Sequence, residues 1–97
     1  MVRQVVFRPQ AEDEILEARQ WYESRQTGLG RAFGQAADEI VSRIAANPLA
    51  FPRVGNEIRR AVLSRFPYAI YFRDVENTIV VLAVHGQRDP KRWQNRS

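Results

Sequence analysis

The stretch Phe66-Pro-Tyr-Ala-Ile-Tyr-Phe-Arg-Asp-Val-Glu-Asn-Thr-Ile-Val-Val-Leu-Ala-Val-His85 decides the fold. Two runs rich in aromatic and β-branched residues, 68–73 and 78–85, are separated by the short polar link Asp74-Val-Glu-Asn77, which favours a β-hairpin. The second run is apolar on both faces: Ile79, Val81 and Ala83 on one, Val80, Leu82 and Val84 on the other. Such a strand is expected at the centre of a sheet, covered on at least one side.

The residues before this hairpin predict one more strand at 58–65, a helical hairpin and an N-terminal strand. The β-branched run Val2–Phe7 indicates that first strand, and Pro9 suits the first turn of a helix. Helical spacing follows in two segments, with apolar positions Ala11, Ile15, Ala18 and Tyr22, then Leu29, Phe33, Ala36, Ile40 and Ile44. Gly28 and Gly30 separate the two helices, and the second helix must end at Asn47-Pro48.

Residues Pro48 to Asn56 are expected to form a loop. The element order is then β-α-α-β-β-β, which predicts a single α+β domain over residues 1–97. In this domain an antiparallel helical hairpin packs on a small, mainly antiparallel β-sheet.

Strand alternation assigns the arginines to faces. In 58–65 it places Arg59 with Ala61 and Leu63, and Arg60 on the opposite face. In 68–73 one face carries Tyr68, Ile70 and Phe72, and the other carries Ala69, Tyr71 and Arg73. An arginine on the packed face needs a partner, such as Glu57, Asp74 or a backbone carbonyl.

The charge is concentrated in one half of the chain. Residues 1–52 carry 6 Arg and 7 Asp or Glu, a net charge of −1, whereas residues 53–97 carry 8 Arg, 1 Lys and 4 Asp or Glu, a net charge of +5. A basic half of this kind suits nucleic acid or an acidic protein segment as partner.

Several function classes are excluded or disfavoured by composition. With no Cys and one His, disulfides are excluded and neither a structural nor a catalytic metal site is expected. Gly28-Leu-Gly30 lies between two helices, so no nucleotide-binding loop and no cofactor are predicted. No signal-like segment and no apolar run of about 20 residues is present, so the protein is expected in the cytoplasm without a membrane partner.

The end of the chain offers the strongest candidates for function. His85 closes the central strand, where it either accepts a structural hydrogen bond or acts as an acid or base. Arg88 and Asp89 form either a local ion pair in a turn or, with Lys91, Arg92 and Trp93, a rim that contacts a partner.

These residues together resemble the RelE/ParE superfamily of bacterial toxins from type II toxin–antitoxin modules. The resemblance covers nearly the whole chain, through the order and spacing of short motifs. They are Phe7-Arg-Pro9, Ala11 with the acidic helix start, Trp21-Tyr22-Glu23, Phe33, Pro48-Leu-Ala-Phe51-Pro52, Arg59-Arg60, Phe66-Pro67-Tyr68-Ala-Ile-Tyr71 and Val84-His85-Gly-Gln-Arg88-Asp89-Pro90 with Trp93. The closing His-x-x-Arg-Asp-Pro is most similar to the ParE branch, often labelled plasmid stabilisation proteins.

The resemblance implies a RelE/ParE-like fold and a cognate antitoxin. The C-terminal segment of such an antitoxin wraps the toxin, and its N-terminal part binds operator DNA. ParE-like toxins inhibit DNA gyrase by binding. For that activity the partner-binding candidates in this chain are Arg59, Arg60, His85, Arg88, Asp89, Lys91, Arg92 and Trp93.

Two alternatives stay open beside gyrase inhibition. RelE-like toxins are ribosome-dependent endoribonucleases that cut mRNA, a reaction that needs an acid, a base and cations over the phosphate. The candidates for it are Arg59, Arg73, Tyr71, His85 and Arg88, although Lys91 is the only lysine in the chain. The third reading is an inactive homologue that acts only with its antitoxin in operator binding.

Overall fold

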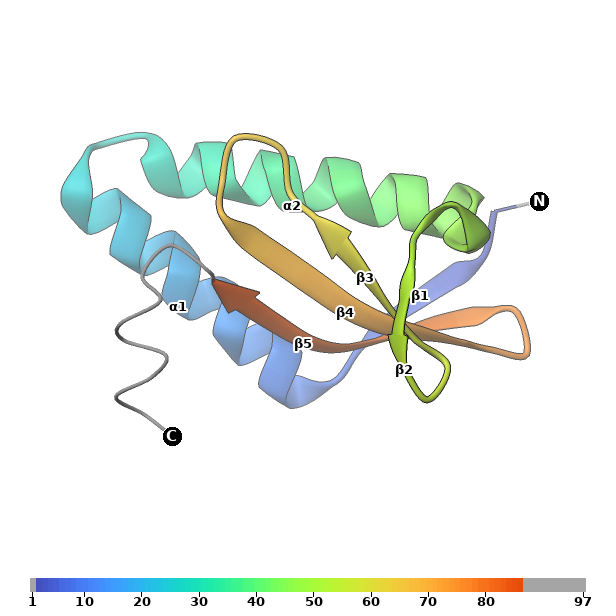
Figure 1. The fold of residues 1–97 in the computed structure, drawn as a ribbon. Helices are drawn as coiled ribbons and strands as arrows, with labels where there is room; N and C mark the ends of the chain where they lie inside the picture. The colour runs from blue at the N-terminus through green and yellow to red at the C-terminus, as the bar shows by residue number, and fades with distance from the viewer. Residues whose placement is uncertain (1, 87–97) are drawn as a thin grey trace.

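The structure is a computed structural model that describes residues 2–86. Two long helices are followed by most of the sheet (Figure 1). In chain order the elements are β1 (Gln4–Phe7), α1 (Pro9–Arg25), α2 (Leu29–Ala46), the 3-10 helix η1 (Pro48–Ala50), β2 (Arg53–Gly55), β3 (Ile58–Val62), β4 (Tyr68–Val75) and β5 (Thr78–Gly86).

The strands form one sheet in the order β1-β5-β4-β3-β2. Strand β1 runs parallel to β5, and every other neighbouring pair is antiparallel. The α+β fold with a mainly antiparallel sheet is confirmed. The expectation that the apolar strand is central is met only in part, because β5 is an interior strand between β1 and β4, whereas the middle strand is β4.

The helical hairpin lies on one side of the sheet and covers that face (Figure 1). The core lies between the helices and this face of the sheet. Alternate side chains of the strands point into it, including Ile70 and Phe72 of β4 and Ile79 and Val81 of β5, which are fully buried. Aromatic rings fill the space near the helical turn: Tyr22, Phe33, Phe66 and Tyr68 contact one another at centroid distances of 4.8–5.9 Å. No helix within residues 2–86 lies on the opposite face of the sheet.

Glu23, near the end of α1, stabilises the start of α2. Gly28 precedes α2 with a positive φ of 94° and has no side chain to accept the helix's first N–H groups. The Glu23 carboxylate accepts the N–H of Gly28 at 3.1 Å and the N–H of Gly30 at 3.0 Å. A carboxylate at this end also matches the positive pole of the helix dipole.

The loop expected at Pro48–Asn56 was predicted wrongly in part. It contains the 3-10 helix η1 and the short edge strand β2, which pairs with β3 through an irregular register. Neither piece has a periodic apolar pattern, so sequence patterning could not distinguish them from a loop. The predicted strand 58–65 is too long: β3 ends at Val62, and the chain then turns through Arg65, which has a positive φ of 69°.

A β-bulge in β5 changes which side chains face the helices. Phe72 of β4 is opposite Val81, but the preceding residue Tyr71 is opposite Ala83, so Leu82 is an extra residue in β5. Beyond the bulge the alternation is reversed, and Val84 rather than Ala83 joins the core at 3% exposure. The predicted grouping of Ala83 with Ile79 and Val81 is therefore wrong, because a bulge re-aims every side chain that follows it.

Candidate functional site

Four of the predicted residues lie together on the face of the sheet that the helices leave uncovered. Arg60 of β3 is directly opposite Tyr71 of β4, and Arg73 follows two residues later on the same face. His85 reaches this face because of the bulge at Leu82, and its ring lies 5.6 Å from the Tyr71 ring. We call Arg60, Tyr71, Arg73 and His85 the outer-face cluster.

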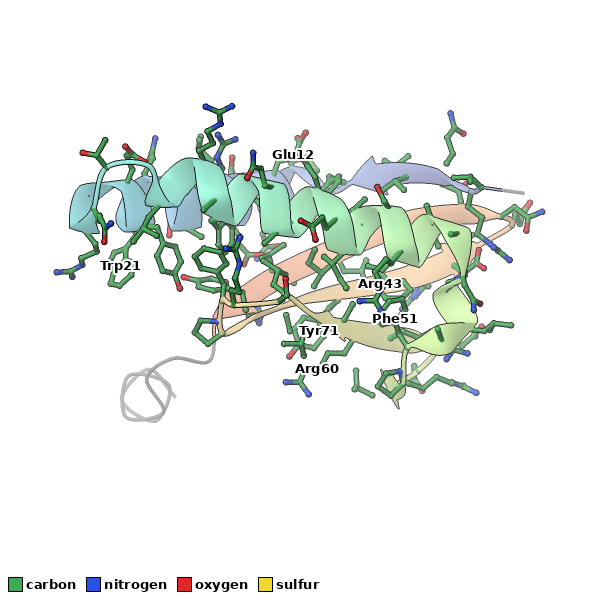
Figure 2. The ribbon with its side chains drawn as sticks, turned by 90° about the horizontal axis from the view of Figure 1, so that it is seen from above. Glu12, Trp21, Arg43, Phe51, Arg60 and Tyr71 are labelled. Atoms are coloured by element: carbon green, nitrogen blue, oxygen red, sulfur yellow. The ribbon has the colours of Figure 1, made fainter. Side chains whose placement is uncertain are left out.

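Figure 2 shows Arg60 and Tyr71 beside each other, on the side of β3 and β4 away from α2. All four members of the outer-face cluster are partly exposed. They combine two permanent cations, one phenol and one imidazole within neighbouring strands. Such a set can bind an anion and, when suitably placed, transfer a proton.

Glu14 of α1 approaches the cluster from the edge of β5. Strand β1 leaves the sheet after Phe7, so within residues 2–86 no strand pairs with the edge of β5 beyond Val81. One Glu14 oxygen, Oε1, accepts the N–H of Val84 at 2.7 Å, and the other lies 3.4 Å from His85 Nε2. Glu14 therefore provides an acceptor for one N–H of this strand edge and places its second oxygen beside the His85 ring.

Arg59 lies apart from the outer-face cluster, on the helix-facing side of β3. Its Nη1 donates a hydrogen bond of 2.6 Å to the backbone carbonyl of Phe51. A backbone carbonyl was one of the partners expected for the arginine on the packed face. The contact joins β3 to the end of η1, so Arg59 has a structural task in addition to any binding role.

The remaining predicted site residues lie outside the part of the chain that the structure describes. They are Arg88, Asp89, Lys91, Arg92 and Trp93. Their role in partner binding stays a prediction from sequence.

The chain of residues 2–86 offers little for a metal ion. Within it, no group of three or more His, Cys, Asp and Glu side chains could hold one. None of the described helices is both long enough and apolar enough to cross a membrane.

Comparison with known proteins identifies the family. The sequence model of the "ParE toxin of type II toxin-antitoxin system, parDE" matches residues 5–90, which is most of the chain. The chain belongs to the ParE toxin family. Its RelE/ParE character, expected from the sequence motifs, is confirmed.

Curated relatives and solved structures agree with this ParE assignment. Toxin ParE2 of Mycobacterium tuberculosis is 28% identical over 92 residues, which cover 93% of this chain and 88% of the relative. Two solved structures show the same fold. The chromosomal ParDE system of P. aeruginosa matches with a TM-score of 0.76 at 17% identity, over 88% of this chain and 96% of that one. The RelBE2 complex of Mycobacterium tuberculosis matches with a TM-score of 0.65 at 15% identity, over 90% of this chain and 100% of that one.

Glu14 is the residue beside this candidate site that sequence reasoning missed. It was interpreted only as one of three acidic residues at the positive end of a helix dipole. The sequence feature that could have revealed its role is its position on the helix. Glu14 lies three residues after Ala11 and four before Ala18, on the same face as these two buried residues. A carboxylate on the apolar stripe of a helix is expected to have a specific partner.

Proposed function

We propose that this ParE-family toxin inhibits DNA gyrase by binding to it, and that a cognate antitoxin neutralises it. The observation that carries the proposal is the match of the ParE family model to residues 5–90. This range includes the closing His85-x-x-Arg88-Asp89-Pro90 motif. Gyrase inhibition is the activity that resemblance to the ParE branch implies.

The geometry around the site supports a binding role. Arg59, a candidate cation for phosphate chemistry, donates to the Phe51 carbonyl on the helix-facing side of the sheet. His85 Nε2 lies beside the Glu14 carboxylate, and the only lysine in the chain is Lys91. Two of the five ribonuclease candidates thus have structural partners.

The antitoxin is the second part of the proposal. The ParDE and RelBE structures with the same fold are those of toxin–antitoxin systems. For this chain we infer an antitoxin that binds the toxin and carries it to operator DNA, with both proteins in the cytoplasm.

One observation favours the ribonuclease alternative. Tyr71, Arg73 and His85, all candidates for mRNA cleavage, converge on one face together with Arg60. An acid, a base and two cations on one surface meet the basic needs of 2′-OH attack on a phosphodiester.

A pair of assays on the purified toxin separates these functions. Gyrase inhibition predicts loss of plasmid supercoiling and no new mRNA ends in a translating extract, and added antitoxin should restore supercoiling. Intact supercoiling together with mRNA cuts at the ribosomal A site would replace the proposal by the ribonuclease. If neither activity appears and expression leaves growth unchanged, the chain is an inactive homologue.

A further inference from the structure

A second group of arginines lies on the helix-facing side of the sheet, at the edge that β2 forms. Arg53 of β2 is directly opposite Arg59 of β3, so the two side chains leave the same face of the sheet. Arg43, in the last turn of α2, approaches from the helical layer, and its Cζ lies 5.6 Å from the centroid of the Phe51 ring (Figure 2). The Phe51 carbonyl in turn accepts the hydrogen bond from Arg59. We call Arg43, Arg53 and Arg59 the edge cluster.

Phe51 attaches this edge cluster to the core. Its ring lies 6.0 Å from the ring of Phe72, which is fully buried in β4 directly opposite Arg59. Arg43 stands over one aromatic ring, a contact that favours a cation at that place. Three elements, α2, β2 and β3, thus gather three permanent cations around one anchored aromatic residue.

The edge cluster has no counter-charge in the part of the chain that the structure describes. None of its three arginines forms an ion pair within residues 2–86. The acidic residues closest to them along the chain are Glu39 and Glu57, both exposed and neither in an ion pair with these arginines. Like charges directly opposite each other in an antiparallel pair are destabilising. The edge cluster is therefore suited to an anion from outside the chain.

The number and type of the cations select the anion. A guanidinium group matches the oxygens of a phosphate with a planar fork of donors. A single carboxylate would neutralise only one of the three arginines, whereas duplex DNA carries a negative charge about every 1.7 Å along its axis. Arg43 and Arg53 are exposed, so a ligand too large to enter a pocket can reach them. The edge cluster therefore fits a polyphosphate backbone.

We propose that the edge cluster binds the phosphate backbone of duplex DNA. This goes beyond inhibition of gyrase through protein contacts, because the toxin itself holds DNA. The choice of DNA over RNA rests on the proposed function, since gyrase acts on duplex DNA. Phosphate contacts carry no sequence information, so any duplex is expected to bind.

The test measures the affinity of the full-length toxin for a short fluorescent DNA duplex over a series of salt concentrations. Each phosphate contact adds about 0.9 to the slope of log K against log salt concentration. Arg43→Gln and Arg53→Gln should each reduce that slope by about one and weaken binding about tenfold near 0.1 M salt. Arg31→Gln is the matched control, because it removes the same charge from an exposed position at the other end of α2, about 18 Å away. This control should keep the wild-type slope and change the affinity less than twofold.

Two results of this titration would overturn the edge cluster as the DNA site. One is an equal loss of slope in Arg43→Gln, Arg53→Gln and Arg31→Gln, which would make binding a matter of net charge. The other is a loss of slope in Arg73→Gln alone, which would place the DNA on the outer-face cluster.

A measurement on the unsubstituted toxin does not depend on the folding of any variant. The ring signals of Phe51 in the NMR spectrum should shift when the duplex is added, because Phe51 lies between Arg43 and Arg59. Unshifted Phe51 signals in a saturated complex would contradict the proposal.

Competition experiments separate DNA from other anions. Inorganic phosphate and poly-glutamate should displace the duplex no better than chloride of the same ionic strength, and an RNA duplex of the same sequence should bind no more tightly than DNA. Specific displacement by phosphate would make a free phosphate the ligand, and displacement by poly-glutamate an acidic protein. Tighter binding of RNA that is lost in Arg53→Gln would make RNA the ligand.

The edge-cluster proposal and gyrase inhibition fail in different ways. Duplex binding is measured without gyrase, so its absence overturns the edge-cluster proposal and leaves gyrase inhibition standing. A toxin that binds DNA with the predicted salt slopes but leaves supercoiling intact overturns gyrase inhibition alone.

Discussion

At the scale of single residues, neighbouring arginines have opposite tasks. Arg59 and Arg60 are consecutive in β3, so their side chains leave opposite faces of the sheet. Arg59 bonds to the Phe51 carbonyl beneath the helices, and Arg60 lies beside Tyr71 on the uncovered face. The pair could be assigned to two faces from sequence, but the Phe51 partner could not, because it follows from how η1 folds back on β3.

Arg59→Ala is expected to lower the free energy of unfolding by about 1–3 kcal/mol, because a partly buried carbonyl loses its charged donor. Arg60→Ala, on the exposed face, should change it by less than about 0.5 kcal/mol. Urea denaturation of both variants measures the difference. If Arg60→Ala is the more destabilising of the two, the assignment of Arg59 to structure is wrong.

Glu14 gives a second test at this scale. Glu14→Ala leaves the Val84 N–H without its acceptor and should destabilise the fold by about 1–3 kcal/mol. Glu14→Gln keeps a carbonyl oxygen at this position and should recover most of that loss. The measurement is the midpoint of thermal unfolding of the two variants and of the wild type. If the three midpoints are indistinguishable, the contact between Glu14 and Val84 adds no stability.

At the scale of elements, the bulge in β5 is the feature that brings His85 to the outer-face cluster. With uninterrupted alternation, His85 would share a face with Ile79 and Val81 and point into the core. The extra residue Leu82 places it on the outer face, near Tyr71. The apolar run 79–84 could be predicted as a strand with neighbours on both sides, although β4 and not β5 is the middle strand. Its bulge could not, because every residue in the run is apolar and no glycine or polar residue marks the irregularity.

The end of β5 is fixed by contact with an aromatic ring. A Cβ at Gly86 would lie 2.7 Å from Tyr68 Cζ, and that ring is packed against Tyr22 and Phe33. Gly86→Ala should therefore cost about 1–3 kcal/mol of stability through overpacking. Gly55→Ala is the control, because nothing lies within 4 Å of a Cβ at that position. Chemical denaturation that ranks Gly55→Ala as the more harmful change would refute this packing argument.

The start of α2 depends on a carboxylate from α1. Glu23→Ala removes the acceptor for the N–H groups of Gly28 and Gly30 and should destabilise the protein by about 1 kcal/mol. Glu17→Ala, at an exposed position of the same helix, is the matched control. Amide exchange at the first turn of α2 should accelerate only in Glu23→Ala, and unchanged exchange there would contradict the capping role.

At the scale of the whole molecule, the acidic start of α1 and the arginines of the outer sheet face lie on different sides. Figure 2 shows Glu12 and Arg60 on opposite sides of the molecule. Among the described residues, acidic side chains lie at the start of α1, and Arg60 and Arg73 lie on the sheet face that the helices leave uncovered. Such a distribution orients an acidic partner toward the sheet during encounter.

The members of the outer-face cluster could be named from the sequence, but their grouping could not. Arg60, Tyr71, Arg73 and His85 were all candidates by residue type, and the fold brings them together, while their function stays a prediction. Grouping depended on strand register, on the bulge and on Glu14 reaching the sheet from a helix 70 residues away in the chain. These are tertiary features, and a periodic pattern within one element contains no information about them.

The most direct test of gyrase poisoning is the amount of cleaved plasmid that gyrase retains after denaturation, measured with increasing purified toxin. The account predicts that wild type and Arg31→Ala both raise this cleaved fraction, that Arg88→Ala raises it at least tenfold less, and that antitoxin abolishes the effect. A cleaved fraction that stays at the level of gyrase alone, with toxin in excess and mRNA cut in the parallel extract, would contradict it.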